Sequence, residues 1–311
     1  MKKYFLLFVS VFIYQLSFAQ KQKVVASIDG NCNELKFELK FEDNFDGSSI
    51  DINKWHMKYA PGTLSTEAVD VYYSIDNIKL ENGICKIIPK KETVVRKAVN
   101  WKADSLILDD GEINTRTYNY TSGWMDSNEQ YHYGKFEVRC KVPKGKGLWP
   151  SFWMYGETNK VNNEIDVFEF WNEENAFGRY NQKKLSMVNH MTTHYNKKMS
   201  GKSYVGPDFS LDFHTYSVIW DSTKIEWYVD GELKRKHTKY ITKRGKNVEC
   251  KDVKANNSYY LNPVFPKDPM TIILNLAIQK GKDKPDTDIL NSEFEIDYVR
   301  YYKITDAQPN K

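Results

Sequence analysis

The sequence has few cysteines, and their spacing excludes the most familiar cysteine-based sites. There are four in 311 residues, and no two have the spacing of metal ligands. In an oxidising compartment they would allow three complete disulfide pairings, while buried thiols or a single bridge remain equally open. A cysteine metal centre is therefore not expected. The four are Cys32, Cys85, Cys140 and Cys250.

An excess of one charge is also missing. The chain has 45 basic and 41 acidic residues, and without Lys2 and Lys3 the 45 become 43. A nucleic-acid-binding protein usually shows a basic excess or stripe, whereas these charges are interspersed. We therefore expect no nucleic-acid partner. A neutral polymer suits such a surface, and a sulfated polymer remains open.

Long hydrophobic segments are absent apart from one run at the start, Tyr4 to Phe18. It follows Met-Lys-Lys and ends in small residues, which is typical of a secretory signal. It is too short for a good membrane span, and no cysteine follows directly to carry a lipid. We predict a signal peptide over residues 1–19, cleavage near Ala19, and a secreted or periplasmic protein without a membrane anchor.

Linkers, repeats and helix signals are scarce too. No stretch rich in Pro, Ser or Gly divides the chain, so one domain is the simplest interpretation. We expect a leader over residues 20–35, a single domain over 36–304, a tail over 305–311, and a monomer.

The apolar pattern that is present has a period of two, which indicates strands. It is complete from Lys135 to Val142. Asn82-Gly83 and Asp230-Gly231 predict tight hairpin turns. Many short strands with turns between them predict an all-β sandwich of two antiparallel sheets. Further strands are expected at His214 to Trp220, Met270 to Ile278 and Phe294 to Lys303, with a long loop over residues 172–184.

The most informative segment is Glu164-Ile-Asp-Val-Phe-Glu169. Alternation along a strand places Glu164 and Asp166 on one face but would turn Glu169 away from them. One extra residue, a β-bulge, would bring Glu169 back to that face.

Three carboxylates on one strand face are costly, because they repel one another and must lose water. Glycoside cleavage gives a reason for that cost, since one carboxylate attacks the sugar while another donates a proton. An edge strand whose acids face water is the plainer alternative. Nearby Trp149, Trp153 and Trp171 argue against it, because aromatic rings stack on sugar faces.

These residues resemble glycoside hydrolase family 16. The resemblance covers nearly the whole chain after the leader and implies a concanavalin-like β-jelly roll with a concave substrate cleft. It implies that Glu164 is the nucleophile, Glu169 the general acid/base and Asp166 the residue that tunes them. The matching motifs are Phe41-Glu-Asp-Asn-Phe-Asp-Gly, Tyr120-Thr-Ser-Gly123, Tyr133-Gly-Lys-Phe-Glu-Val-Arg, Pro143-Lys-Gly-Lys-Gly-Leu-Trp149, Trp149-Pro-Ser-Phe-Trp153, Glu164-Ile-Asp-Val-Phe-Glu169, Trp227-Tyr-Val-Asp-Gly231, Leu274-Asn-Leu-Ala277 and Ile296-Asp-Tyr-Val-Arg-Tyr-Tyr302.

The same resemblance suggests further binding residues. Thr192-Thr-His194-Tyr is similar to a segment that laminarinases of the family carry, so His194 and His190 become candidates for substrate binding, against a purely structural role. No cofactor is expected. Family members often bind a structural calcium ion, for which Glu42 and Asp297 are candidates.

The six-residue acidic motif resembles the branch of the family that contains laminarinases, agarases, porphyranases and κ-carrageenases. We therefore expect a retaining endo-hydrolase of a β-linked polysaccharide, with β-1,3-glucan first and an algal galactan second. A non-catalytic carbohydrate-binding sandwich is the competing class, although it would not need both Glu164 and Glu169.

Overall fold

A computed structural model describes part of the chain. The predicted signal peptide lies outside that part, so it stays a prediction. Among the described residues, no helix combines the length and the apolar character needed to cross a lipid bilayer. The described residues are 23–25, 35–56, 63–64, 69–99, 115–158, 161–172, 184–193, 196–252, 258–281, 284–285 and 292–305.

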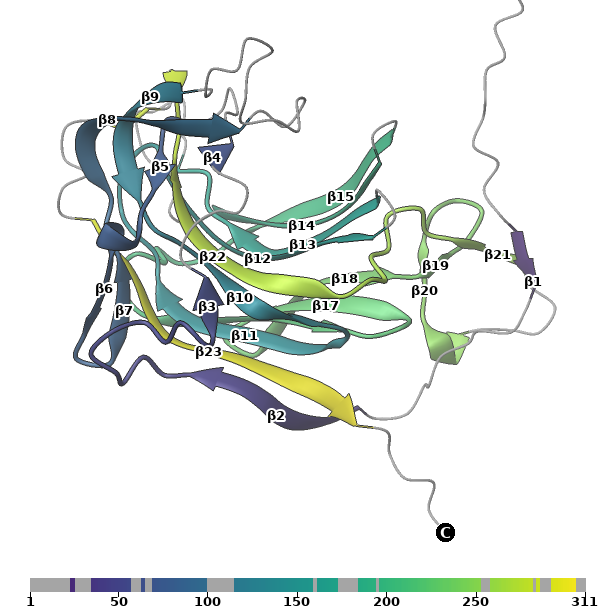
Figure 1. The fold of residues 1–311 in the computed structure, drawn as a ribbon. Helices are drawn as coiled ribbons and strands as arrows, with labels where there is room; N and C mark the ends of the chain where they lie inside the picture. Colours follow the sequence, from purple (N-terminus) through teal and green to yellow (C-terminus); the bar gives the residue numbers. More distant parts are fainter. Residues whose placement is uncertain are drawn as a thin grey trace, which may run out of the picture.

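Two antiparallel sheets packed face to face make up most of the molecule (Figure 1). In the described part of the chain, the first sheet has seven strands. In spatial order they are β15 (Asn196–Val205), β14 (Lys184–Thr193), β13 (Val161–Glu169), β12 (Leu148–Thr158), β22 (Met270–Ile278), β10 (Trp124–Tyr131) and β3 (Trp55–His56).

The second sheet packs against the first. Counted over the described residues it has eight strands, one of which, β2 (Lys36–Asp43), pairs with β23 off the main path. The others, in spatial order, are β18 (Glu232–Thr238), β17 (Lys224–Val229), β16 (His214–Trp220), β11 (Gly134–Lys141), β23 (Phe294–Thr305), β7 (Ile84–Ile87) and β6 (Ile78–Glu81).

Two small sheets and two short 3₁₀ segments complete the described structure. One small sheet lies beside the edges of the sandwich and the other stands above one end of the first sheet (Figure 1). The first contains β1 (Lys23–Val25), β21 (Ser258–Leu261), β19 (Tyr240–Ile241) and β20 (Asn247–Val248), the second contains β4 (Thr63–Leu64), β8 (Lys90–Val99), β9 (Thr115–Ser122) and β5 (Tyr72–Tyr73), and the 3₁₀ segments are η1 (Ile75–Asn77) and η2 (Cys250–Asp252).

The core lies between the two main sheets and follows the predicted alternation. Phe136 and Val138 of β11 are fully buried and pack into one continuous hydrophobic cluster. Trp220 and Trp227 bring two large side chains from neighbouring strands of the same sheet. Burying a large apolar side chain stabilises a fold by about 1.5–3 kcal/mol, so this layer holds the sheets together.

The predicted hairpin turns are confirmed. Asn82 and Gly83 have φ values of 54° and 74° between β6 and β7, and Asp230 and Gly231 have 50° and 78° between β17 and β18. Both residues of a type I′ turn need positive φ, which Asn, Asp and Gly tolerate best. These turns fix the register of both hairpins.

Of the four cysteines, Cys85 and Cys140 are buried free thiols. Burial raises the pKa of both groups, so neither thiolate forms readily. These two residues therefore act as small core side chains. Cys32 lies outside the described residues.

The first sheet is strongly curved, and the second sheet packs on its convex side (Figure 1). Leu274 of β22 and Phe152 of β12 are paired and point into the core, while the next pair along the two strands, Ser151 and Asn275, faces the concave side. The concave face of the first sheet is thus free of the second sheet, and it is the surface that the acidic strand reaches.

Candidate active site

The acidic strand β13 lies in the middle of the curved sheet, between β12 and β14. Its register places Tyr155 of β12 opposite Glu164, Trp153 opposite Asp166 and Ser151 opposite Glu169. These three partners alternate along β12, so they share one face. Residues directly opposite each other also share a face, and therefore all three carboxylates project from the concave side.

An extra residue in β13 makes this alignment possible. Between Asp166 and Glu169 the strand advances three residues, while both neighbouring strands advance two, Ser151 to Trp153 and Ser186 to Val188. The predicted β-bulge is therefore confirmed. Val167 is buried in the core, as are Ile165 and Phe168, so the bulge occupies the core side and returns Glu169 to the concave side.

Asp166 is the most buried of the three acids, with 2% of its surface exposed. Burial raises the pKa of its carboxyl group well above the ordinary value, and the nearby charge of Glu169 raises it further. A hydrogen bond with Glu164 acts in the opposite direction. Asp166 consequently keeps its proton more readily than an ordinary aspartate, so the face need not carry three full negative charges.

The tryptophans singled out in the sequence also lie at this face. Trp153 is directly opposite Asp166, and its indole N–H donates to Oδ1 of Asn275 at 2.8 Å. The rings of Trp149 and Trp171 are in contact, with centroids 3.6 Å apart. Trp149 lies two residues from Ser151 along β12 and therefore faces the same side. The acids are thus flanked by aromatic surface.

Several residues on this face were not identified from the sequence. Trp124 of β10 packs edge-on against Trp153, with ring centroids 5.6 Å apart, and also contacts Tyr73 at 5.2 Å. Asn275 of β22 connects Trp153 to Tyr73, since it accepts the hydrogen bond of the Trp153 indole and its own amide nitrogen lies 3.4 Å from the Tyr73 hydroxyl. The one available signal was Asn275 itself, a polar residue in the otherwise apolar run Met270–Ile278.

A further carboxyl group, Asp126, projects from the concave face beside these aromatics. It lies opposite Ile273 of β22 and His56 of β3, and it accepts a hydrogen bond from the Trp124 indole at 3.1 Å. Burial raises the pKa of Asp126. The concave face therefore offers both stacking surface and hydrogen-bonding groups along its width, as a bound sugar chain would require.

Of the two candidate histidines, only His190 lies among the described residues. The backbone of His190 in β14 pairs directly with Glu164, next to the acidic strand. His194 lies outside the described residues. A role for either histidine in substrate binding stays a prediction.

The two candidate calcium ligands each pair with a different arginine. Glu42 binds Nε of Arg300 at 2.7 Å, while Asp297 forms an ion pair with Arg139. The described residues contain no group of three or more His, Cys, Asp or Glu side chains that could hold a metal ion. In this arrangement both carboxylates neutralise arginine side chains. A structural calcium ion stays a prediction.

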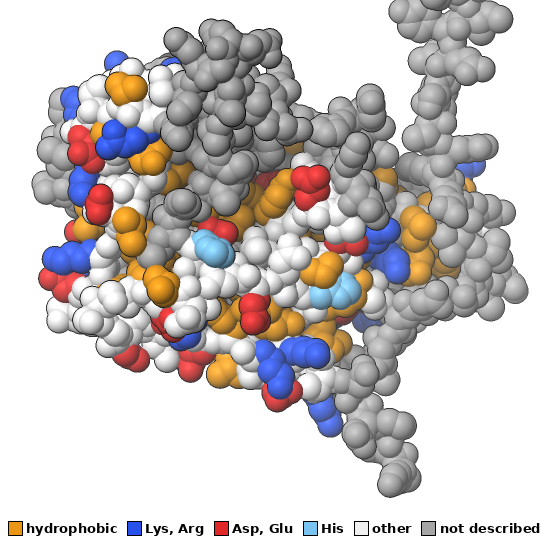
Figure 2. Space-filling view, in the orientation of Figure 1, with side chains coloured by type: hydrophobic (Ala, Val, Ile, Leu, Met, Phe, Trp, Pro, Cys, Tyr) orange, Lys and Arg blue, Asp and Glu red, His pale blue; other side chains and the backbone are white. Residues whose placement is uncertain are grey.

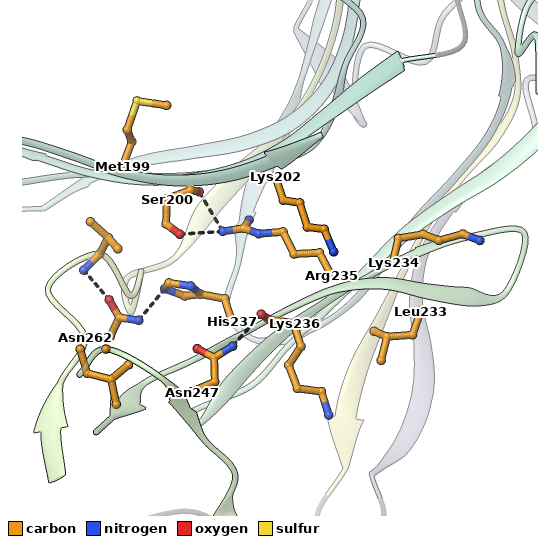
Figure 3. A pocket seen from close by; sticks show the side chains of 13 residues that line it. Met199, Ser200, Lys202, Leu233, Lys234, Arg235, Lys236, His237, Asn247 and Asn262 are labelled. Atoms are coloured by element: carbon orange, nitrogen blue, oxygen red, sulfur yellow. Dashed lines mark hydrogen bonds between the residues drawn. The ribbon is translucent and has the colours of Figure 1, made fainter. Parts of the chain in front are cut away.

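A separate cavity of about 570 Å³ lies between the edge strands β15 and β18 (Figure 3). Arg235 and His237 form part of its wall, together with Lys202 and two lysines whose charges are paired: Lys234 binds Glu232 at 2.5 Å, and Lys236 binds Glu226 at 2.8 Å. Burial and the charge of Arg235 lower the pKa of His237 to about 4. No predicted site residue lines this cavity, so the candidate active site is the acidic concave face.

Charges of both signs alternate along the lower part of the molecule in the space-filling view (Figure 2). This agrees with the near balance of basic and acidic residues in the sequence. The described surface seen from this side therefore carries mixed charge, without a patch of one sign that would attract a polyelectrolyte.

Comparisons with known proteins give a consistent family assignment. Residues 94–300 match the model of the glycosyl hydrolases family 16. Glucan endo-1,3-beta-glucosidase A1 of Niallia circulans is 29% identical over 85% of this chain, and the aligned part spans only 38% of that protein's length. Glucan endo-1,3-beta-glucosidase of Cryptopygus antarcticus is 25% identical, with 84% of this chain and 90% of that protein covered.

Among solved structures, the laminarinase catalytic domain of Thermotoga maritima MSB8 superimposes with a TM-score of 0.63 at 29% identity. The match covers 87% of this chain and 99% of that one. The predicted jelly-roll sandwich is thereby confirmed. Because the family model covers most of the chain and the acidic motif occupies the face that such a fold leaves open, the chain belongs to the glycosyl hydrolases family 16.

Proposed function

We propose that this chain is a secreted, retaining endo-hydrolase of a β-linked polysaccharide, with β-1,3-glucan as its substrate class. One observation carries the proposal: a bulge aligns Glu164, Asp166 and Glu169 on the open concave face. A binding module needs aromatic surface but has no use for three costly acids there. The names of the curated relatives support the choice of β-1,3-glucan.

In the proposed reaction, two carboxylates act in two steps. Glu164 attacks the anomeric carbon while Glu169 donates a proton to the departing glycosidic oxygen, which leaves a glycosyl-enzyme. Glu169 then takes a proton from water, and the water oxygen displaces Glu164 with the original configuration retained. Retention needs the two carboxyl groups close together on one face, and the bulge supports this arrangement.

Asp166 lies between the two in sequence and tunes both. Its hydrogen bond with Glu164 orients the nucleophile, and its electrostatic contact with Glu169 connects the acid/base to the same network. The proton of this hydrogen bond can lie on either carboxyl group, and Asp166 gives up the bond as Glu164 bonds to sugar. Asp166 therefore supplies both orientation and a change in local charge.

The substrate and the reaction are tested together by a product assay. The chain is incubated with laminarin, mixed-linkage glucan, agarose, porphyran and carrageenan, and the anomer formed first is observed by NMR. We expect β-anomer oligosaccharides from laminarin. In Glu164→Gln and Glu169→Gln the rate should fall by about 10²–10⁴-fold or more, the usual contribution of a positioned acid or nucleophile. A variant as active as wild type contradicts the assignment.

The same panel separates the alternatives. Preferential cleavage of a galactan would move the substrate class to the second candidate while leaving the roles of Glu164 and Glu169 intact. Binding without cleavage of any polymer would favour a carbohydrate-binding sandwich.

Secretion, a monomeric state and a structural calcium ion are separate proposals. Export of the full chain should yield a product beginning at Gln20, determined by N-terminal sequencing, that elutes as a monomer. Thermal unfolding with Ca²⁺ and with chelator tests the calcium prediction through the unfolding temperature.

A further inference from the structure

The main chain at the bulge is held from the opposite sheet. The carbonyl oxygen of Asp166 accepts a hydrogen bond from the indole N–H of Trp227 at 2.8 Å. Carbonyl groups of a regular strand point along the sheet toward neighbouring strands. A donor in β17 of the other sheet can be reached only because the irregularity turns this carbonyl toward the core. The bond therefore marks the bulge itself.

We propose that Trp227 is a positioning residue, whose indole N–H fixes the carbonyl of Asp166 and so keeps the bulge in the form that turns Glu169 toward Glu164. This inference rests on the proposed function of that acidic face. A buried carbonyl without a donor is unfavourable, so a bulge in this conformation needs a partner, and Trp227 supplies it. Trp227 touches no substrate and acts only through the strand.

Trp227 is itself held rigidly. Its side chain is fully buried, and the guanidinium of Arg235 lies 4.1 Å from the centre of its ring. Arg235 is buried too, and it donates to the carbonyl of Ser200 at 2.8 Å and to the Ser200 hydroxyl at 3.0 Å (Figure 3). Burial lowers the pKa of Arg235 to about 10, so it remains charged at neutral pH.

These contacts form a brace between the two sheets. It runs from the bulge in β13 to Trp227 in β17, across to Arg235 in β18, and back to Ser200 in β15, the edge strand of the curved sheet. A planar guanidinium that both stacks and hydrogen-bonds fixes the ring more firmly than packing alone. The indole N–H is consequently held at one position relative to the acidic strand.

The sequence offers a matched control in Trp220. This residue lies in β16 of the same sheet, is also fully buried, and donates its indole N–H to the carbonyl of Pro266 at 3.1 Å. Replacing either tryptophan with Phe exchanges a buried indole for a smaller phenyl ring and removes one N–H donated to a main-chain carbonyl. Only Trp227→Phe releases the bulge.

The experiment compares wild type, Trp227→Phe and Trp220→Phe on laminarin, with Glu164→Gln as the reference for the proposed function. In Trp227→Phe we expect kcat to fall by about 10–100-fold with KM nearly unchanged, since small displacements of reacting groups cost rates of this size. The pH profile of kcat should also change, because the charge of Glu169, which raises the pKa of Asp166, would lie farther from that group. In Trp220→Phe the value of kcat and its pH profile should stay close to those of wild type, despite a similar loss of thermal stability.

Equal kcat and equal pH profiles in the two Phe variants would overturn the inference. If wild type cleaves nothing, the proposed function fails instead, and the brace is then judged by hydrogen exchange at the amides of Val167 and Phe168: faster exchange in Trp227→Phe than in Trp220→Phe supports it, and equal exchange refutes it. If Trp227→Phe does not fold, Arg235→Lys replaces it. That variant keeps the charge but loses the flat group that stacks on Trp227, and its kcat should also be lower than that of wild type. A kcat and a pH profile equal to those of wild type would count against the brace.

Discussion

Asp166 is a carboxyl group buried beside two other acids, and its raised pKa has a consequence for stability. Between about pH 3.9, the ordinary value for aspartate, and its higher pKa in the folded protein, the folded state binds more protons than the unfolded state. Stability therefore falls as the pH rises through this window. Asp166→Asn removes the group that titrates, so its unfolding temperature should exceed that of wild type at pH 7–8, and the advantage should shrink as the pH falls toward about 4.

The same substitution should lower activity, because the amide cannot change its charge during the reaction. A change of one pKa unit in the acid/base group corresponds to about a tenfold change in rate, so we expect kcat to fall about tenfold or more. Asp212→Asn, at an exposed position, is the control for loss of a carboxyl group. An Asp166→Asn protein that is less stable than wild type at pH 8 would show that the burial of this charge is fully compensated.

At the scale of the strand, the alignment of the acids depends on two things together: the number of residues between Asp166 and Glu169, and the bulge that takes up the extra one. Deleting Val167 removes the extra residue, and the shortened strand can then pair regularly with Ser151 still opposite Glu169 and Trp153 still opposite Asp166. We expect the deletion variant to fold with a loss of roughly 2–4 kcal/mol from the missing buried side chain and to keep measurable activity.

Deleting Phe168 together with Val167 is the matching change that reverses the face. Glu169 then follows Asp166 directly, and adjacent residues of a strand lie on opposite faces, so Glu169 turns to the core side. Activity on laminarin should then be at least about 10³-fold below that of the Val167 deletion variant, because the acid/base is lost. Similar activities in the two variants would mean that the face occupied by Glu169 does not matter.

The elements that could be predicted from the sequence are those with a complete two-residue period or a strong turn signal. Lys135 to Val142 and the Asn82-Gly83 hairpin met this condition and form as predicted. Lys90–Val99 did not, because charged side chains interrupt its apolar pattern, and it pairs with Thr115–Ser122 outside the two main sheets. The apolar period alone therefore misses strands whose pattern is interrupted by charged residues.

The candidate site could be predicted for the same local reason, and only in part. The bulge follows from three acids that must share a face, which is a relation within six residues. The contacts of Asn275 and of Trp227 cross between strands or between sheets, with 122 residues separating Trp153 from Asn275 and 61 separating Asp166 from Trp227. No periodicity connects positions so far apart, so the support around the acids appears only when the sheets are packed.

At the scale of the whole molecule, the two large sheets have different roles. The second sheet supplies the core that fixes the curved sheet, and it leaves the concave side of that sheet uncovered. In the proposed function this side binds the middle of a polysaccharide chain, as endo action requires. Binding then depends on aromatic contacts and hydrogen bonds spread over several strands.

The balance of charge over the whole molecule predicts how activity responds to salt. Attraction between a charged enzyme and a charged polymer weakens as ions screen it, whereas stacking on a neutral sugar is little affected. With 45 basic and 41 acidic residues, the chain has little net charge to steer a polyanion. We therefore expect kcat/KM on laminarin to change by less than about twofold between about 0.05 and 0.5 M NaCl. A parallel measurement on carrageenan provides the contrast, and a tenfold or larger decrease with salt on the preferred substrate would show that recognition is electrostatic and that the substrate is a sulfated polymer.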